Sequence, residues 1–298
     1  MKSLKIAAAL GIAAIVVAAL SSCSSSKSNS PASSTNSAGG GSSTAAVSLP
    51  GSFDGKDLVI PAVTGYPPYA FLDGSNIVGI DPDLAMALNT TFGRKVTQKQ
   101  DSFENSMLGL QRGTYFTVMG ADITAERLKT FDMVSLLQDY YQFSTAASHS
   151  EIGSNLDDLC GLKISTVAAS SSIPVLADQS TKCKSAGKPA ITTLTFADQG
   201  NAGLAVQSGR ADATTASVTN LGYIGNQQPG KWKISGPTYG HIFIGAATIK
   251  GSGAAQAIAK SINIMIANGE YTKILAKYGV EKSAITTSEV NPDPASAK

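Results

Sequence analysis

Val78-Gly79-Ile80-Asp81-Pro82-Asp83-Leu84-Ala85 is the stretch of this chain that most clearly predicts its fold, because it carries a well-marked helix start directly after a turn. Asp81 is the predicted N-cap, Pro82 occupies the first helical position, and Asp83 places a favourable negative charge in the first turn. The apolar side of this helix is expected to consist of Leu84, Met86, Ala87 and Leu88, and Gly93 should end it.

Strands and helices are expected to alternate on both sides of this stretch. A buried strand at 58–63, an aromatic- and proline-rich loop at 64–72 and a turn at 73–76 precede it. After it, the patterns predict helices near 104–112, 124–127, 199–208, 254–267 and 271–278, and strands at 116–119, 161–167 and 211–216. This alternation predicts an α/β fold with parallel sheets, and its repetition suggests two lobes with a ligand cleft between them.

The N-terminus predicts a lipid-anchored protein outside the cytoplasm. Lys2 and Lys5 precede an apolar stretch, 6–20, and small residues lead directly to Cys23. We therefore expect a lipoprotein signal peptide at 1–22, a lipid on Cys23, and a flexible Ser/Gly/Ala tether over 23–53. An ordinary secretory signal and a short membrane span are the alternatives, although a span needs roughly 20 apolar residues.

Composition excludes several classes of function. The formal net charge is +2 and no Lys/Arg stripe stands out, so nucleic acid is not an expected partner. With Cys23 carrying lipid, Cys160 and Cys183 remain as an even pair, and a disulfide between them is expected in an oxidising compartment. Two cysteines and two distant histidines, His149 and His241, give no metal-ligand spacing, and no cofactor is expected.

Several motifs resemble those of the family 3 extracellular solute-binding proteins, the polar amino-acid receptors of ABC importers. They are Tyr66-Pro67-Pro68-Tyr69, Val78-Gly79-Ile80-Asp81, Ile123-Thr124-Ala125-Glu126-Arg127, Ser208-Gly209-Arg210-Ala211-Asp212 and Gly269-Glu270-Tyr271. The resemblance implies a two-lobed, type II periplasmic-binding-protein fold with two crossing hinge strands, near 144–148 and 242–246. Lobe 1 would comprise 54–145 and 243–285, lobe 2 would comprise 146–242, and 286–298 would be a tail.

The resemblance also implies a ligand site. Arg127 would hold the α-carboxylate of the ligand, because a guanidinium can bind a carboxylate in a bidentate way; the alternative is a surface arginine that pairs with Glu126 or Asp132. The side chain and backbone N–H of Ser170 would also contact this carboxylate, and Gly120 would let the backbone approach the ligand. Tyr66 and Phe103 would hold the ligand side chain between their rings, although Phe103 could instead be a core residue.

The chain departs from the family where the ligand ammonium is normally held. Ser217 occupies the position of the usual aspartate, and a hydroxyl cannot balance a buried ammonium. Asp122 stands where the family has Ser or Thr, so it is a candidate replacement. Its alternatives are a solvated helix-terminal acid or a partner for Arg127. A betaine-like cation would suit the rings of Tyr66, Tyr69, Tyr140 and Tyr141, if they line the cleft.

The expected function is therefore capture of an amino acid or related carboxylate for delivery to an ABC permease, by a monomeric protein without enzymatic activity. Two alternatives come from other classes. One is a dehydratase of the cyclohexadienyl type, for which Asp122 would be the acid in the cleft. The other is a ligand-sensing receptor domain.

Overall fold

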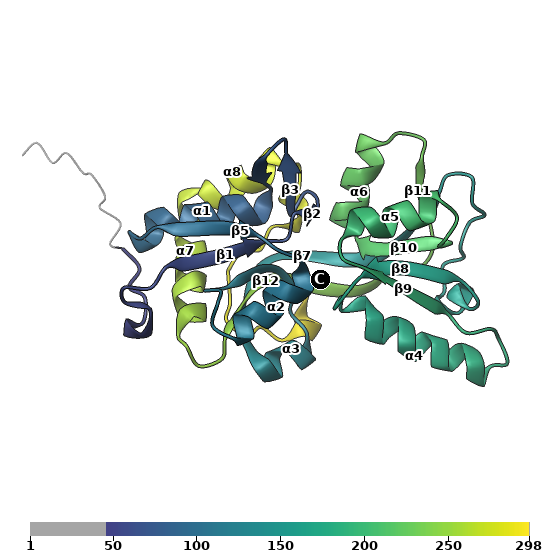
Figure 1. The fold of residues 1–298 in the computed structure, drawn as a ribbon, viewed down its shortest axis with the longest axis horizontal. Helices are drawn as coiled ribbons and strands as arrows, with labels where there is room; N and C mark the ends of the chain where they lie inside the picture. Colours follow the sequence, from purple (N-terminus) through teal and green to yellow (C-terminus); the bar gives the residue numbers. More distant parts are fainter. Residues whose placement is uncertain (1–45, 298) are drawn as a thin grey trace, which may run out of the picture. The chain divides into compact units, whose positions relative to one another are not determined.

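Helices and strands alternate along residues 46–297, which are the part of the chain that the structure, a computed structural model, describes (Figure 1). The helices are α1 (Ile80–Phe92), α2 (Phe103–Gln111), α3 (Ala125–Thr130), α4 (Ser172–Ser185), α5 (Gln199–Gln207), α6 (Val218–Gln227), α7 (Ala254–Asn268) and α8 (Glu270–Lys277). The strands are β1 (Leu58–Ala62), β2 (Gly65–Tyr66), β3 (Ala70–Asp73), β4 (Asn76–Val78), β5 (Val96–Gln100), β6 (Val118–Asp122), β7 (Phe131–Ala146), β8 (Lys163–Val167), β9 (Thr192–Phe196), β10 (Ala213–Ser217), β11 (Trp232–Ile234) and β12 (Tyr239–Ile249). The α/β class is as predicted, whereas the predicted signal peptide and Cys23 lie outside the described residues.

The predicted parallel pairing is present, but the main sheet is mixed and also contains antiparallel strands. Its strand order is β6-β12-β7-β10-β8-β9, with β11 paired to β7. β8 pairs in parallel with β9 and β10, but β7 and β12 run antiparallel along almost their whole length. A smaller parallel pair is formed by β1 and β5, and β2, β3 and β4 form a separate antiparallel sheet.

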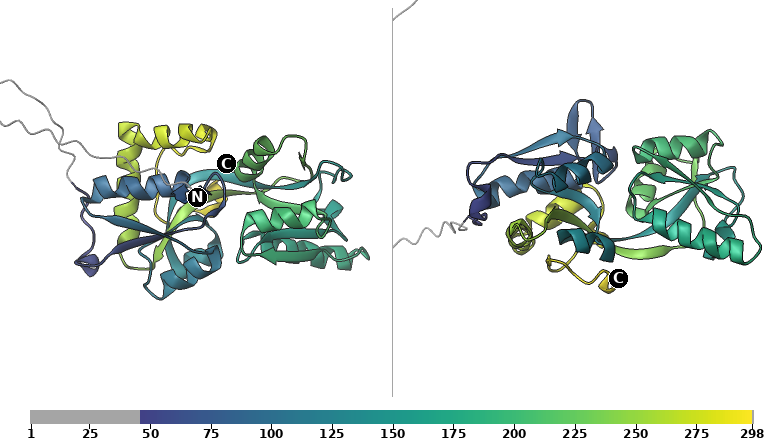
Figure 2. Two further views of the ribbon diagram at one scale, coloured as in Figure 1. Left: turned by 45° about the horizontal axis from the view of Figure 1, so that its top comes forward. Right: turned by 60° about the horizontal axis from the view of Figure 1, so that its bottom comes forward.

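Two main hydrophobic cores lie toward opposite ends of the long strands β7 and β12. The first core includes Leu58, Leu84, Leu137 and Ile258, and α1, α7 and α8 contribute to it. The second core includes Phe143, Leu159, Ile164 and Leu176, and α4 covers it. Figures 1 and 2 show β7 and β12 passing from one group of elements to the other. On β7, Tyr141 belongs to the first core and Phe143 to the second, a few residues before the predicted boundary near 145.

The stretch that begins α1 differs from the prediction in a way that matters for the site. Gly79, not Asp81, is the N-cap, with a φ of 136° that glycine adopts readily. A Cβ on Gly79 would lie 2.3 Å from the carbonyl oxygen of Tyr69, so this position also needs the absence of a side chain. Asp81 is instead buried in the first turn. Gly93 ends the helix, as predicted, and has the left-handed conformation. Met86, expected on the apolar side, is 48% exposed.

Two further segments differ from the sequence-based expectation. The predicted loop at 64–72 contains β2 and the start of β3, which pair antiparallel. The predicted turn at 73–76 closes the hairpin of β3 and β4. The strand predicted at 116–119 begins at Val118 and continues to Asp122, because β6 pairs with β12 up to the register Ile244↔Asp122. Asp122 therefore lies at the end of a strand, and is not a helix-terminal acid in solvent.

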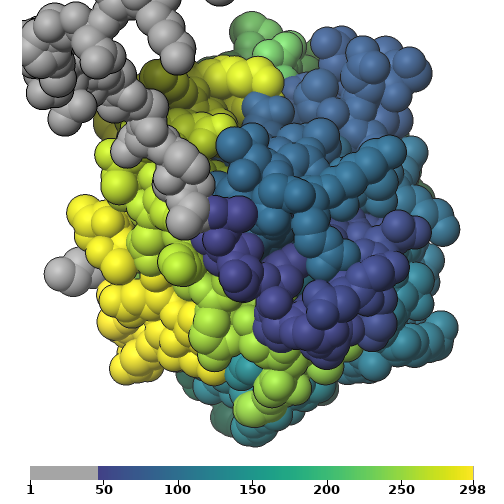
Figure 3. Space-filling model, turned by 90° about the vertical axis from the view of Figure 1, so that its left-hand side faces the viewer, coloured from purple at the N-terminus to yellow at the C-terminus, as the bar shows by residue number. Residues whose placement is uncertain are grey.

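The first described residues pack against the first core. Val47 is 2% exposed, and its N–H donates to the carbonyl of Thr91 at the end of α1. Pro50 lies against Gly253, the residue before α7. Figure 3 shows this segment in purple beside the yellow-green of α7. Within residues 46–297, no helix combines the length and the apolar character that crossing a membrane requires.

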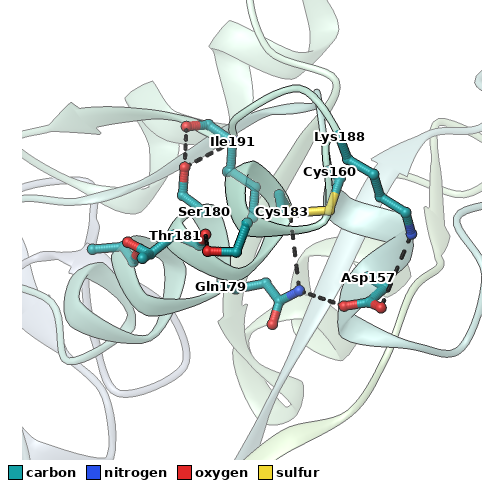
Figure 4. Close-up of a disulfide and its surroundings, with 10 residues drawn as sticks. Asp157, Cys160, Gln179, Ser180, Thr181, Cys183, Lys188 and Ile191 are labelled. Atoms are coloured by element: carbon teal, nitrogen blue, oxygen red, sulfur yellow. Dashed lines mark hydrogen bonds and ion pairs between the residues drawn. A yellow bond between two sulfur atoms is a disulfide. The ribbon is translucent and has the colours of Figure 1, made fainter.

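The predicted disulfide is confirmed. Cys160 and Cys183 are bonded, with their Cα atoms 5.6 Å apart. The bond joins the segment just before β8 to α4 (Figure 4). Gln179 donates to a carboxylate oxygen of Asp157 at 2.8 Å beside it. Because Cys183 is 1% exposed, the bond is packed into the second core.

Candidate functional site

A cavity with an empty volume of about 630 Å³, including space open to solvent, lies where elements of the two cores face each other. β6, α2 and α3 and the loops before α1 form one wall, and the loop between β8 and α4 and the start of α5 form the other. The lining residues are Val63, Gly65, Tyr66, Tyr69, Asp81, Phe103, Met119, Gly120, Asp122, Arg127, Tyr141, Val167, Ser170, Asp198, Gln199 and Ile244. Six residues predicted from the sequence are thus brought to one cavity: Arg127, Asp122, Gly120, Tyr66, Phe103 and Ser170.

Arg127 and Asp122 form the main charged pair of the cavity. The Arg127 guanidinium lies 3.7 Å from Oδ2 of Asp122, and the two side chains are 13% and 7% exposed. Its Nη1 donates to the backbone carbonyl of Asp122 at 2.8 Å, and its Nη2 donates to the carbonyl of Ala169 at 3.1 Å. The ion-pair distance exceeds that of a direct charge-assisted hydrogen bond. The guanidinium therefore retains donors that a bound anion could use.

Asp122 is held from three sides. Besides Arg127, it accepts a hydrogen bond from the Tyr141 hydroxyl at 2.9 Å and one from the Ser171 hydroxyl. Burial raises the pKa of Tyr141 well above its ordinary value, so its hydroxyl stays protonated and donates. Ser171, which the sequence analysis did not single out, comes from the loop before α4, and Asp122 therefore links the two walls of the cavity.

Aromatic rings supply much of the remaining lining. Arg127 lies over the ring of Phe103, 5.1 Å from its centroid, in a cation–π arrangement. Tyr66 and Tyr69 are neighbours with ring centroids 5.5 Å apart. The Tyr69 hydroxyl donates to the buried carboxylate of Asp139 at 2.5 Å, which fixes the ring. Of the four tyrosines considered for a cation site, Tyr66, Tyr69 and Tyr141 line the cavity and Tyr140 does not.

Asp81 is a cavity residue that the sequence analysis missed. Its side chain is buried, and its Oδ1 has no hydrogen-bond partner among the described residues. Its Oδ2 lies against Gly120, where a Cβ would come within 2.5 Å of it. Burial raises the pKa of the Asp81 carboxyl to about 8. No signal in the sequence separates Asp81 from Asp83, because both acids suit the first turn of a helix.

The wall from the second core is made of small and polar residues. Ser170 shares a hydrogen bond of 3.0 Å with the Ser172 hydroxyl, and the preceding Ala169 has a φ of 62°. That left-handed conformation is uncommon for alanine and turns its carbonyl toward Arg127. Asp198 caps α5, with both carboxylate oxygens accepting hydrogen bonds from Asn201. The carboxylate of Asp198 is therefore already satisfied.

Ser217 is not among the residues that line the cavity. Its backbone N–H donates to the Tyr66 hydroxyl at 2.9 Å, and its own hydroxyl caps α6 by accepting from the N–H of Asn220. The side chain of Asn220 donates to the carbonyl of Pro67, so α6 is bonded twice to the loop that carries Tyr66. Ser217 supports the position of Tyr66 instead of facing the cavity.

Comparison with known proteins gives a consistent result. Residues 58–281 match the family described as bacterial extracellular solute-binding proteins, family 3. The arginine-binding protein ArgT of Corynebacterium glutamicum is 26% identical over 235 residues, which are 77% of this chain and 76% of that protein. Among solved structures, an ancestral arginine-binding protein bound to arginine is 29% identical with a TM-score of 0.68, over 75% of this chain and 98% of that one. The same kind of ancestral protein bound to glutamine is 30% identical with a TM-score of 0.66, over 76% and 98%.

Proposed function

We propose that this chain, which belongs to family 3 of the bacterial extracellular solute-binding proteins, captures an amino acid in the cavity between its two cores and delivers it to an ABC permease. The observation that carries this proposal is the nearly buried guanidinium of Arg127 at the cavity wall, only partly used by its protein partners. The α-carboxylate of the ligand binds there, with Ser170 close to it, and Gly120 lets the backbone of β6 approach the ligand. The names of the reported relatives, which call them arginine-binding proteins, support a receptor over an enzyme.

Asp122 is the proposed partner of the ligand's α-ammonium. An α-carboxylate and an α-ammonium are joined through a single carbon, so the groups that bind them must also be neighbours. Asp122 and Arg127 satisfy this condition with 3.7 Å between their charged groups. Ser217 does not, because its polar groups are engaged with Tyr66 and Asn220. In the ligand-free state the Asp122–Arg127 pair neutralises both charges, and a zwitterionic ligand replaces part of that pairing.

Closure of two lobes is the proposed mechanical event. We propose lobe 1 as 54–145 with 243–285, lobe 2 as 146–242, and the connecting strands near 144–148 and 242–246 as the hinge. Two separate hydrophobic cores joined through β7 and β12 support this division. A hinge that closes on ligand would present a different surface to the permease than the open form does.

The family is extracellular, so the body of the chain acts outside the cytoplasm. We further propose that Cys23 carries a lipid that holds the receptor at the membrane. The support is the sequence of signal, cysteine and Ser/Gly-rich tether. One acyl chain binds membranes only reversibly, and two or three hold a protein firmly.

Calorimetry after a thermal-shift screen of amino acids, betaines and organic acids tests the proposal, since a ligand of the folded form raises the melting temperature. Arg127→Ala should abolish amino-acid binding while the melting temperature stays near wild type. Arg112→Ala, an exposed arginine at the end of α2, is the matched control and should bind normally. Asp122→Asn should weaken binding far more than Ser217→Ala.

Three results would count against the proposal. Unchanged affinity in Arg127→Ala would remove this arginine from the site, and equally small effects of the Asp122 and Ser217 variants would remove Asp122. Conversion of prephenate or arogenate by the purified protein would favour the dehydratase alternative. Binding with no product formed would exclude it.

A further inference from the structure

Asp81 has a buried carboxyl group to which the described part of the chain gives no partner. The residue is 8% exposed, and its Oδ1 makes no hydrogen bond within residues 46–297. An ionised carboxylate that is buried without a hydrogen bond or a counter-charge is strongly unfavourable. Native proteins rarely keep such a group, and where they do it usually has a function.

The position of Asp81 directs this group at the ligand cavity. Asp81 lines the cavity, and its Oδ2 lies against Gly120, whose missing side chain leaves the space that the carboxylate fills. Gly120 and Asp122 are two apart on β6, so they lie on the same face of the strand. Two carboxylates therefore line the cavity beside β6: Asp122 from the strand itself, and Asp81 from the start of α1 beside Gly120.

The charges around the cavity differ in how well they are satisfied. Arg127 and Asp122 are paired with each other, and Asp198 is satisfied by Asn201. The tyrosines that line the cavity are neutral, since burial raises their pKa values well above the ordinary range. Asp81 alone among these lining groups has no described counter-charge or donor, so it is the lining acid whose carboxyl is left for a ligand to pair with.

Resting on the proposed function, we propose that Asp81 binds the positively charged side chain of the ligand, so that the receptor selects an amino acid with a cationic side chain. Each charge of such a ligand then meets one fixed opposite charge: its α-carboxylate meets Arg127, its α-ammonium meets Asp122, and its side-chain cation meets Asp81. The rings of Tyr66 and Phe103 contact the apolar part of the side chain. The reported relatives are named as arginine-binding proteins, and an ancestral arginine-binding protein has been solved with arginine and also with glutamine, so these names alone do not require a charged side chain.

A bound cation also changes the protonation of Asp81. Burial raises the pKa of this carboxyl to about 8, so the free protein holds the proton at pH 7. The ionisable groups that line the same cavity from the other elements are Asp122, Arg127, Asp198, Tyr66, Tyr69 and Tyr141. A cation that contacts Asp81 favours its ionised form, and binding therefore releases this proton.

The test compares L-arginine with L-citrulline, which has nearly the same shape but an uncharged side chain. Calorimetry on wild type should show arginine binding more tightly by about 10- to 100-fold, the range of a hydrogen bond to a charged group. Asp81→Asn should remove most of that preference and leave citrulline affinity within about twofold. Asp83→Asn is the matched control: Asp83 is in the same helical turn, but its carboxylate faces Lys277 at 2.7 Å and is not a cavity residue.

A second measurement needs no variant. Calorimetry of wild type at pH 7 in buffers of different ionisation enthalpy should detect release of about one proton per arginine bound, and none per citrulline. Equal wild-type affinities for the two ligands, an unchanged preference in Asp81→Asn, or no proton release would each overturn the role of Asp81. If citrulline or glutamine still binds through Arg127, the proposed function stands. If no amino acid binds wild type, the proposed function itself fails.

Discussion

Replacing Asp81 by asparagine should stabilise the ligand-free protein at neutral pH, and the effect should grow as pH rises. Burial raises the pKa of Asp81 from 3.8 to about 8, so between these values the folded protein holds a proton that the unfolded chain has lost. Folding stability then decreases with rising pH, by about 1.4 kcal/mol per pH unit. Integrated from pH 4 to pH 7, this is about 4 kcal/mol that the wild type loses and a neutral asparagine does not.

Urea unfolding of wild type, Asp81→Asn and Asp83→Asn at pH 5, 6, 7 and 8 provides the assay. The free energy of unfolding of Asp81→Asn relative to wild type should increase by about 1.4 kcal/mol per unit between pH 5 and 7, and should level off above about pH 8. Asp83→Asn keeps Asp81, so its free energy of unfolding should still fall as pH rises from 5 to 7. Parallel curves for wild type and Asp81→Asn would refute the reasoning, because they would mean that Asp81 ionises in the folded protein as it does in the unfolded chain.

Two further predictions concern other parts of the molecule. Removing the disulfide with Cys160→Ala and Cys183→Ala should lower the free energy of unfolding by about 3 kcal/mol in denaturant titrations, because a loop spanning 23 residues is no longer closed in the unfolded state. Ligand affinity should not change. A large loss of affinity would contradict the separation of this bond from the cavity. Gly120→Ala should weaken ligand binding about tenfold or more by calorimetry, because φ of Gly120 is 76° and the new Cβ would lie 2.5 Å from Asp81. If Gly120→Ala bound ligand as tightly as wild type, β6 would be shown to shift without consequence.

Much of the fold could be predicted because its signals are local. The start of α1 is specified by glycine, proline and acidic residues, and Gly93 ends it in the expected left-handed conformation. The pairing of β7 with β12 could not be predicted from residue pattern alone. It joins segments about a hundred residues apart, such as Phe243 and Gln138, and buries apolar and polar residues on the same strand.

The site was predictable where a motif resembles that of a known family. The resemblance at Thr124-Ala125-Glu126-Arg127 implied a ligand arginine, and Arg127 does line the cavity. Asp81 has an ordinary structural role available, as a helix-capping acid, and sequence alone favours that role. Its actual position depends on Gly79 taking the N-cap and on the space left by Gly120, and both are properties of the tertiary structure.

The hydrogen bonds between the cores also bear on the speed of ligand exchange. On one side of the cavity Tyr66 bonds to the amide of Ser217, and on the other Arg127 bonds to the carbonyl of Ala169. A ligand enclosed behind both contacts cannot leave until they break, and a new ligand cannot enter. Opening would then limit both steps, so the observed association rate should reach a ceiling at high ligand concentration instead of rising in proportion. If the two lobes close on the ligand as proposed, the hydrogen bond between Ser217 and Tyr66 is one of the contacts that opening must break.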